Sequence, residues 1–236
     1  MAVTKAILPV AGMGTRFLPA TKSVPKEMLP LVDKPLIQYA VEEALASGIK
    51  EIILITAKGK QAIEDHFDRS LGLELLLEGK EDAKRLAMVR EITDLLEVVS
   101  IRQKKPHGLG HAIALARDLF GPEPFAVMLP DDIYHAPHRP ALRQLLDVFE
   151  ERGQSVMAVE EVPRSAVSSY GIVAATEATG TVRTVTSMVE KPAPEDAPSN
   201  LAITGRYVFS PELFDYLART APDAKGEIQL TAAMNA

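Results

Sequence analysis

The chain has 236 residues, of which 47% are hydrophobic, and its formal net charge at pH 7 is −6. This length and apolar content suffice for one large α/β domain with a substantial core. The acidic balance argues against nucleic acid as a partner, because proteins that bind a phosphate backbone present a basic face. No apolar run is long enough to span a membrane, and the absence of cysteine excludes disulfides and thiolate metal sites. We expect a cytoplasmic protein.

Strands alternate with helices through the first 130 residues. Short apolar runs predict strands, and amphipathic or charged runs predict helices between them. The predicted strands are 6–10, 51–56, 97–102 and 125–129, and the predicted helices are 36–47, 60–67, 71–78, 82–95 and 109–119. The many charges between residues 60 and 95 predict a solvated outer face. This alternation is typical of a mostly parallel, right-handed doubly wound sheet.

The pattern changes in the second half of the chain. Helices are predicted over 140–151 and 211–219, and another is expected from residue 227. The predicted strands are 155–160, 171–175, 182–189 and 203–209, with a hairpin turn at Thr179-Gly180. We expect these strands to extend the same sheet in an antiparallel or mixed manner. The predicted fold class is α/β, with a Rossmann-like doubly wound mixed sheet in three α/β/α layers.

Positive charge gathers around the loop that follows the first strand. Gly12, Gly14, Thr15 and Arg16 come directly after this strand, and Lys26 follows a proline further on. A strand that ends in glycines and cations can bring backbone N–H groups and positive charge to a phosphate. The loop therefore predicts a phosphate site. A tight turn with cations that only confer solubility is the alternative.

Two common nucleotide motifs do not fit this loop. The dinucleotide fingerprint needs a third glycine where Phe17 stands, and Pro19 and Pro25 interrupt any helix here. The second predicted strand also ends without an acidic residue that could hold a ribose hydroxyl. A P-loop is excluded because no Gly-Lys-Ser/Thr follows a glycine loop.

Asp131 and Asp132 stand at the carboxyl end of the fourth predicted strand, where open α/β sheets bind ligands. Two adjacent acids beside an anionic substrate would be unfavourable without a divalent cation. Mg²⁺ takes oxygen ligands of this kind, so it is the predicted cofactor. A turn or helix-capping role for the two aspartates is the alternative.

Glu190 and Lys191, judged by residue type alone, would form an exposed ion pair.

Residues 12–39, GMGTRFLPATKSVPKEMLPLVDKPLIQY, resemble the opening signature of the sugar-nucleotide pyrophosphorylase family. Within this family they look most like the branch that transfers uridylyl groups to glucose 1-phosphate. Matching stretches follow in the family's order at residues 102–112, 129–132, 168–173, 189–192, 197–209 and 226–231. Relatives that transfer thymidylyl groups share the GxGTR loop but usually lack the TKxxPKEMLP continuation present here at 21–30.

The resemblance implies a reaction of UTP with glucose 1-phosphate that gives UDP-glucose and pyrophosphate, with Mg²⁺ as cofactor. It implies a single nucleotide-diphospho-sugar transferase domain over 1–236, with a nucleotide-binding half (1–135), a sugar-binding half (136–236) and a homo-oligomeric state. The implied catalytic residues are Arg16, Lys26, Asp131, which is also the metal ligand, and Lys191. The implied nucleotide contacts are Ala11, Gly12, Gly14, Thr15, Glu27, Gln103, Gly108 and Asp132. The implied sugar contacts are Gly171, Glu190, Lys191 and Ile203.

Three alternatives remain open at this point. Thymidylyl transfer and transfer to a different sugar 1-phosphate would use the same residues. Members of the family continue for several tens of residues after the last residue of this chain, and Ala232 stands where they usually have aspartate. We therefore expect a truncated C-terminus, which keeps open a non-catalytic, regulatory paralogue that only binds nucleotide sugars.

Overall fold

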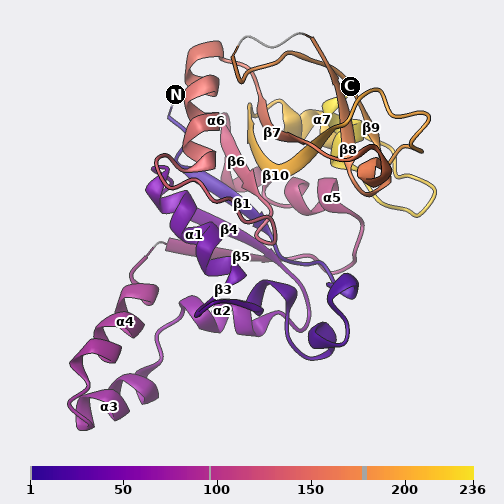
Figure 1. The fold of residues 1–236 in the computed structure, drawn as a ribbon. Coiled ribbons are helices and arrows are strands. Elements are labelled where there is room, and N and C mark those ends of the chain that lie inside the picture. The colour runs from indigo at the N-terminus through magenta and orange to yellow at the C-terminus, as the bar shows by residue number, and fades with distance from the viewer. Residues whose placement is uncertain (1, 96, 177–179) are drawn as a thin grey trace.

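The computed structural model describes residues 2–95, 97–176 and 180–236 (Figure 1). An eight-stranded sheet has the order β5-β4-β1-β6-β10-β8-β9, and β7 also pairs with β10. These strands are β1 (Lys5–Pro9), β4 (Glu51–Thr56), β5 (Glu97–Arg102), β6 (Phe125–Met128), β7 (Val156–Glu161), β8 (Gly171–Ala175), β9 (Val185–Glu190) and β10 (Leu201–Phe209). Two short strands, β2 (Pro30–Leu31) and β3 (Lys34–Pro35), form a separate hairpin.

The first half of the chain builds the parallel part of the sheet. β1 lies between β4 and β6, and β4 pairs with β5, all in parallel. All four strands were predicted, with bounds within one residue of those observed. Because parallel strands point the same way, the loops after β1, β4, β5 and β6 meet at one edge of the sheet. This carboxyl edge is where the predicted phosphate loop and the two adjacent aspartates both emerge.

The second half adds antiparallel strands to this sheet. β10 pairs with β6 through Arg206–Phe209 and with β8 at its first two residues. It pairs with β7 both near its start, at Leu201–Ile203, and near its end, at Tyr207 and Val208. β8 and β9 form the antiparallel pair at the far end of the sheet. The predicted mixed extension is therefore confirmed. The predicted turn at Thr179-Gly180 includes Thr179, which lies outside the described residues.

Helices cover both faces of the sheet, which confirms the predicted three layers. In β1, Ala6 and Leu8 point into one buried cluster and Ile7 points into the other, as the alternation of side chains along a strand requires. The helices on the first face are α1 (Leu36–Ala46), α2 (Gln61–Phe67) and α6 (Ala141–Arg152). Those on the second face are α5 (Leu109–Ala114), α7 (Leu213–Arg219) and α8 (Leu230–Met234). No helix among the described residues is long and apolar enough to cross a membrane.

Two predicted helices differ from the observed ones. The helix predicted over 109–119 ends as α5 at Ala114 and is followed by a 3₁₀ turn, Arg117–Leu119, because the chain tightens to i→i+3 hydrogen bonds. The last helix begins at Leu230 rather than at residue 227. The backbone of Ile228 accounts for this delay: its N–H donates to His107 and its carbonyl accepts from Gly110. Such pairing to another segment keeps residue 228 out of the helix.

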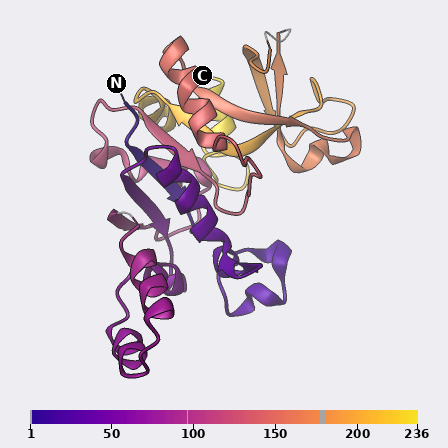
Figure 2. The ribbon, with the colours of Figure 1, turned by 60° about the vertical axis from the view of Figure 1, so that its left-hand side comes forward.

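A pair of helices, α3 (Leu71–Gly79) and α4 (Ala83–Thr93), projects from the body of the molecule (Figures 1 and 2). The expectation of a wholly solvated charged face was wrong for Glu74, whose side chain is only 3% exposed. Its carboxylate accepts from Arg69 at 2.9 and 3.0 Å and from Arg90 at 3.0 Å. Leucines are exposed on the same helix instead, among them Leu71 and Leu75.

The charge of Glu74 should stabilise this pair of helices. Arg69 first, and then Arg90, lower the pKa of Glu74 from 4.5 to about 2. Because the pKa is lower in the folded state, the charged carboxylate stabilises the folded protein. This stabilisation is fully present above pH 4.5 and is lost as the pH falls toward 2. We expect Glu74→Gln to speed amide hydrogen exchange in α3 and α4 at neutral pH, which mass spectrometry can measure.

Glu78→Gln is the matched control for this substitution. Among the described residues Glu78 forms an ion pair with Arg90 alone, and its side chain is 46% exposed. Loss of this charge should therefore change exchange much less. Equal exchange in the Glu74→Gln variant and the parent protein would contradict the assigned role.

Candidate functional site

The loop after β1 is shaped by glycine and proline. Gly14 has φ of 65°, a left-handed conformation that glycine adopts with little strain. A Cβ atom at Gly14 would lie 3.1 Å from the Cβ of Lys26, so the two halves of the loop approach each other closely. Three 3₁₀ turns follow, at Thr15–Phe17, Ala20–Lys22 and Lys26–Met28. No α-helix begins in this described segment, in agreement with the poor match to a dinucleotide fingerprint.

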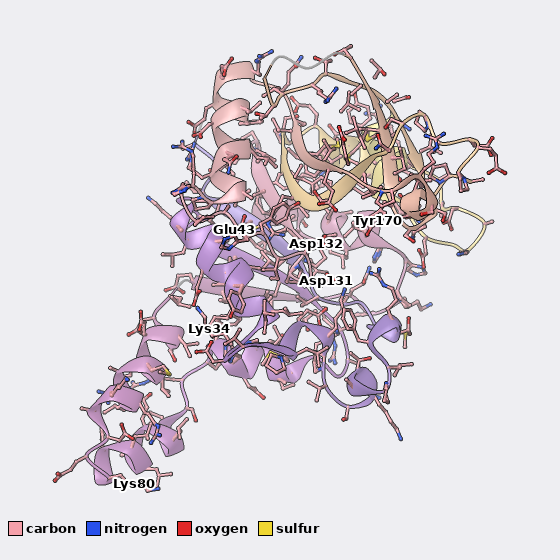
Figure 3. The ribbon with its side chains drawn as sticks, viewed as in Figure 1. Lys34, Glu43, Lys80, Asp131, Asp132 and Tyr170 are labelled. Atoms are coloured by element: carbon pink, nitrogen blue, oxygen red, sulfur yellow. The ribbon has the colours of Figure 1, made fainter. Side chains whose placement is uncertain are left out.

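The structure brings the predicted phosphate loop and the aspartates together. The Nζ atom of Lys26 lies 2.6 Å from Oδ2 of Asp131, and both side chains are mostly buried. Burial raises the pKa of Asp132 and the charge of Asp131 raises it further, whereas the charges of Arg206, Lys26 and Arg16 lower it. Lys26, Asp131 and Asp132 therefore lie together at the carboxyl edge of the sheet, and the charge of Arg16, which is in the same loop as Lys26, acts on Asp132. Figure 3 shows the two aspartates next to each other there.

A second group of predicted residues lies where β8, β9 and β10 meet. Gly171 is the register partner of Glu190 across the β8–β9 pair. A Cβ atom at Gly171 would lie 3.0 Å from Thr231 and 3.1 Å from Ile203, so these elements are closely packed. The carboxylate of Glu190 accepts from the hydroxyl of Thr231 at 3.0 Å. The side chain of Ile203 is buried in the core.

Lys191 directly follows β9 and is exposed. Its φ of 44° is uncommon for a residue other than glycine, and strained backbone of this kind clusters at functional sites. Its ammonium lies 3.3 Å from Glu190, and its side chain is 59% exposed. The ion pair expected from residue type is present, and the ammonium does not contact Lys26 or the aspartates.

Tyr207 connects the two groups of residues. Burial raises the pKa of this tyrosine, and the carboxylates of Asp132 and Glu190 raise it further. Asp132 follows β6, and Glu190 is the last residue of β9. β10, which carries Tyr207, lies between β6 and β8 in the sheet, so the segments that carry the two carboxylates are on either side of it.

A third group contains Gln103 and Gly108. Gln103 follows β5, its backbone N–H donates to Thr56 at 2.8 Å, and its side chain is buried. The amide Nε2 lies 3.3 Å from the carbonyl oxygen of Gly108 and 2.8 Å from Nδ1 of His111. Sequence reasoning assigned His111 no role, because a single histidine without metal-ligand spacing is usually structural.

Glu27 does not face the open site. Its side chain is fully buried, and Oε2 accepts from the ammonium of Lys60 at 2.8 Å. Its other oxygen, Oε1, has no hydrogen-bond partner among the described residues. Burial raises the pKa of Glu27 despite the opposing effect of Lys60. Lys60 was not predicted, since nothing in the sequence links it to a residue 33 positions away.

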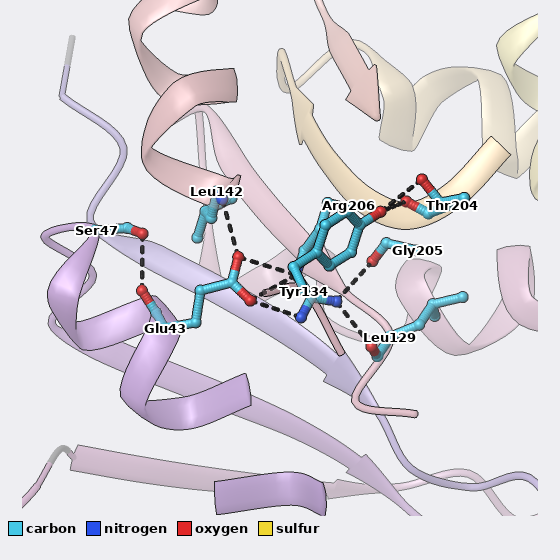
Figure 4. Close-up of polar contacts among 8 residues, drawn as sticks. All are labelled: Glu43, Ser47, Leu129, Tyr134, Leu142, Thr204, Gly205 and Arg206. Atoms are coloured by element: carbon cyan, nitrogen blue, oxygen red, sulfur yellow. Dashed lines mark hydrogen bonds and ion pairs between the residues drawn. The ribbon is translucent and has the colours of Figure 1, made fainter. Parts of the chain in front are cut away.

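A buried arginine supports the segment that carries the aspartates (Figure 4). Arg206 in β10 is fully buried and donates to Glu43 of α1 at 2.7 Å and to the Leu129 carbonyl at 2.8 Å. The ring of Tyr134 stacks 4.9 Å from the guanidinium. Sequence reasoning missed this network, although an arginine within the apolar run 201–209 is a signal that could have indicated it.

The family assignment rests on a match over nearly the whole chain. A family model described as nucleotidyl transferase matches residues 5–236. The chain belongs to the nucleotidyl transferase family. This membership fits a site in which cations and carboxylates gather at the carboxyl edge of a mostly parallel sheet.

Individual nucleotidyl transferases are similar over the same length. A UTP–glucose-1-phosphate uridylyltransferase of Staphylococcus epidermidis is 53% identical over 98% of this chain and 80% of the relative. A crystal structure of a UDP-glucose pyrophosphorylase complexed with UDP-glucose has a TM-score of 0.88 and 42% identity, covering 99% of this chain and 86% of the other. A UTP-bound UDP-glucose pyrophosphorylase from Acinetobacter baumannii has a TM-score of 0.88 and 41% identity, covering 99% and 81%.

The carboxylates suit a divalent cation that shares its ligands with a substrate. The described residues contain no cluster of three or more metal-ligating side chains. Asp131 and Asp132 supply hard oxygen donors, and a cation already lies against Asp131 in the form of the Lys26 ammonium. Mg²⁺ is usually bound by one or two carboxylates together with phosphate oxygens and water, so these two residues fit it.

The network around Arg206 should be essential for stability. Arg206→Met would leave the carboxylate of Glu43 largely buried without its cation, and removing one partner of a buried ion pair costs about 3–5 kcal/mol. We expect a loss of that size in the free energy of unfolding, measured by denaturation in urea. The double variant Glu43→Gln/Arg206→Met should lose less, because a neutral amide can still accept from the N–H of Leu142. Equal losses in both variants would contradict this account.

Proposed function

We propose that this protein transfers a uridylyl group from UTP to glucose 1-phosphate and thereby releases pyrophosphate and forms UDP-glucose. The observation that carries the proposal is the ion pair of Lys26 with Asp131, next to Asp132, at the carboxyl edge of the sheet. The relatives named for this reaction support it, since one is 53% identical over 98% of the chain.

Electrostatic repulsion is the main obstacle to this reaction. Both reactants are anions, and two unit charges about 4 Å apart repel by ~4 kcal/mol at an effective dielectric constant near 20. A phosphate oxygen is already deprotonated at neutral pH, so it can attack the α-phosphorus without a general base. A bond then forms between that oxygen and the α-phosphorus, while the bond from the α-phosphorus to the bridging oxygen breaks and pyrophosphate leaves. Positioning and charge neutralisation therefore carry the rate.

The charged residues of the site would bind the phosphates and the metal ion. Arg16 would donate to the β- and γ-phosphates together with the backbone N–H groups of Gly14 and Thr15. Lys26 would turn from Asp131 to the phosphates, and Lys191 would hold the phosphate of the sugar. Asp131, with Asp132 beside it, would hold Mg²⁺, which supplies positive charge to the phosphates.

The remaining contacts would recognise the uridine and the sugar. Gln103 and the backbone of Gly108 would contact the base, and Ala11, Gly12 and Asp132 the nucleoside. Glu27 would support the phosphate loop from beneath through its ion pair with Lys60. The sugar hydroxyls would meet Glu190 and the backbone at Gly171 and Ile203.

The proposal extends to the organisation of the protein. Residues 1–135 would form the nucleotide-binding half, residues 136–236 the sugar-binding half, and the reaction would take place in the cytoplasm. We also propose a homo-oligomer, in which a second copy covers the exposed leucines of α3. Light scattering on the purified protein measures the assembly, and a monomer at micromolar concentration would exclude it.

The purified protein should release pyrophosphate from UTP and glucose 1-phosphate, and a chelator should stop the release. We expect a higher kcat/KM with UTP than with dTTP, in a coupled pyrophosphate assay. A preference for dTTP would favour the thymidylyl alternative. Binding of UDP-glucose in calorimetry without any turnover would indicate the regulatory, non-catalytic alternative.

Lys26→Ala and Asp131→Ala should each lower kcat by about 10²-fold or more, because each removes charge that is aimed at the reacting phosphates. Lys34→Ala is the matched control, since Lys34 pairs with Glu42 on the neighbouring helix α1. The control should keep nearly full activity. Circular dichroism should show that all three variants are folded, and normal turnover in both site variants would remove their assigned roles.

A further inference from the structure

The orientation of the Gln103 amide is determined by its two neighbours. The carbonyl oxygen of Gly108 can only accept a hydrogen bond, so the amide group nearest to it, at 3.3 Å, must be the nitrogen Nε2. The same nitrogen lies 2.8 Å from Nδ1 of His111. Since Nε2 is a donor, Nδ1 must be the unprotonated acceptor of a neutral ring, and the ring proton is on the other nitrogen.

This arrangement leaves the amide oxygen of Gln103 available to a ligand. No hydrogen bond from the described residues reaches Oε1 of Gln103. An amide oxygen accepts from an N–H group, and uracil presents one at its ring position 3. Cytosine has an unprotonated nitrogen at the same position, so two acceptors would face each other. A fixed amide oxygen thus discriminates between the two pyrimidines.

We propose that His111 is a specificity-determining residue, which holds the Gln103 amide so that its oxygen selects a uracil-type base over cytosine. The inference rests on the proposed function, because Gln103 must face the base. His111 acts through Gln103 and is therefore a positioning residue rather than a catalytic one.

The surroundings of His111 hold its ring in place. The N–H of Gly110 donates to Ile228 at 2.9 Å, and the N–H of Ile228 donates to His107 at 2.8 Å. A Cβ atom at Gly110 would lie 2.8 Å from the carbonyl oxygen of Ile228, so this contact needs glycine. The ring of His107 stands edge to face with that of His111 at a centroid distance of 5.2 Å. Backbone hydrogen bonds and close packing thus hold the first turn of α5 against the segment that precedes α8.

The ring is neutral under ordinary conditions. Burial lowers the pKa of His111, and the charge of the neighbouring His107 lowers it further. The elements packed against α5 are β1, α7 and α8, and α8 contains no titratable side chain. The titratable groups on β1 and α7 are Lys5, Asp215, Tyr216 and Arg219, and those on the loop 220–229 between α7 and α8 are Asp223, Lys225 and Glu227. If His111 were protonated, its Nδ1–H would face Nε2 of Gln103, which is also a donor. The Gln103 amide would then have to rotate to present its oxygen to the ring.

The test compares UTP with CTP, because effects on the phosphates and on the metal cancel in the ratio of their kcat/KM values. His111→Leu removes the acceptor, and we expect the preference for UTP to fall by about tenfold or more, chiefly through a higher KM for UTP. His111→Asn can accept through its own amide oxygen and should keep the preference within about threefold. His138→Leu, which removes an exposed histidine from the loop after β6, is the matched control and should leave the preference unchanged.

A second measurement follows the preference for UTP as the pH is changed. In the parent protein the preference for UTP should decline as the pH is lowered from about 8 to 5, and in His111→Asn it should stay constant. An unchanged ratio in a folded His111→Leu variant, or a flat pH profile in the parent protein, would overturn the inference. Failure of the proposed function would look different: the parent protein would release no pyrophosphate, while calorimetry with UTP and CTP would still measure the effect of His111.

Discussion

The ion pair between Lys26 and Asp131 joins two segments that lie 105 residues apart in the chain. One segment follows β1 and the other follows β6, and these strands are parallel neighbours in the sheet. Only a parallel arrangement brings both carboxyl ends to the same edge. In this contact the ammonium of Lys26 and the carboxylate of Asp131, both mostly buried, neutralise each other.

The support for this site comes from the antiparallel half of the sheet. β10 pairs with β6, and its Arg206 binds the carbonyl of Leu129, two residues before Asp131. Glu43 of α1 balances the charge of the arginine, so helix, sheet and loop are connected by one buried group. Gly205 contributes by its small size, because any side chain there would collide with the carboxylate of Asp132. The position of the aspartates therefore depends on residues from three different parts of the chain.

Much of the fold was predictable because the local patterns are strong. The apolar run EIILIT and the strand at 97–102 were assigned with their observed bounds, since short β-branched segments between helices have few other interpretations. The predicted helix 109–119 was too long because the sequence does not show where i→i+3 bonds replace i→i+4 bonds. Glu74 was expected to be solvated, but Arg69 and Arg90 enclose it in a way that helical spacing alone does not reveal.

The sequence by itself determined the fold class, and it predicted the glycine loop after β1 and the two aspartates as parts of a site, because each of these depends on residue types at short spacing. The tertiary structure alone decided which charges meet. It paired Lys26 with Asp131, buried Glu27 against Lys60, and aligned the Gln103 amide with His111. The physical reason is that ion pairs and hydrogen bonds need atoms within about 3–4 Å, and the distance between residues remote in the chain is set by the packing of the whole sheet.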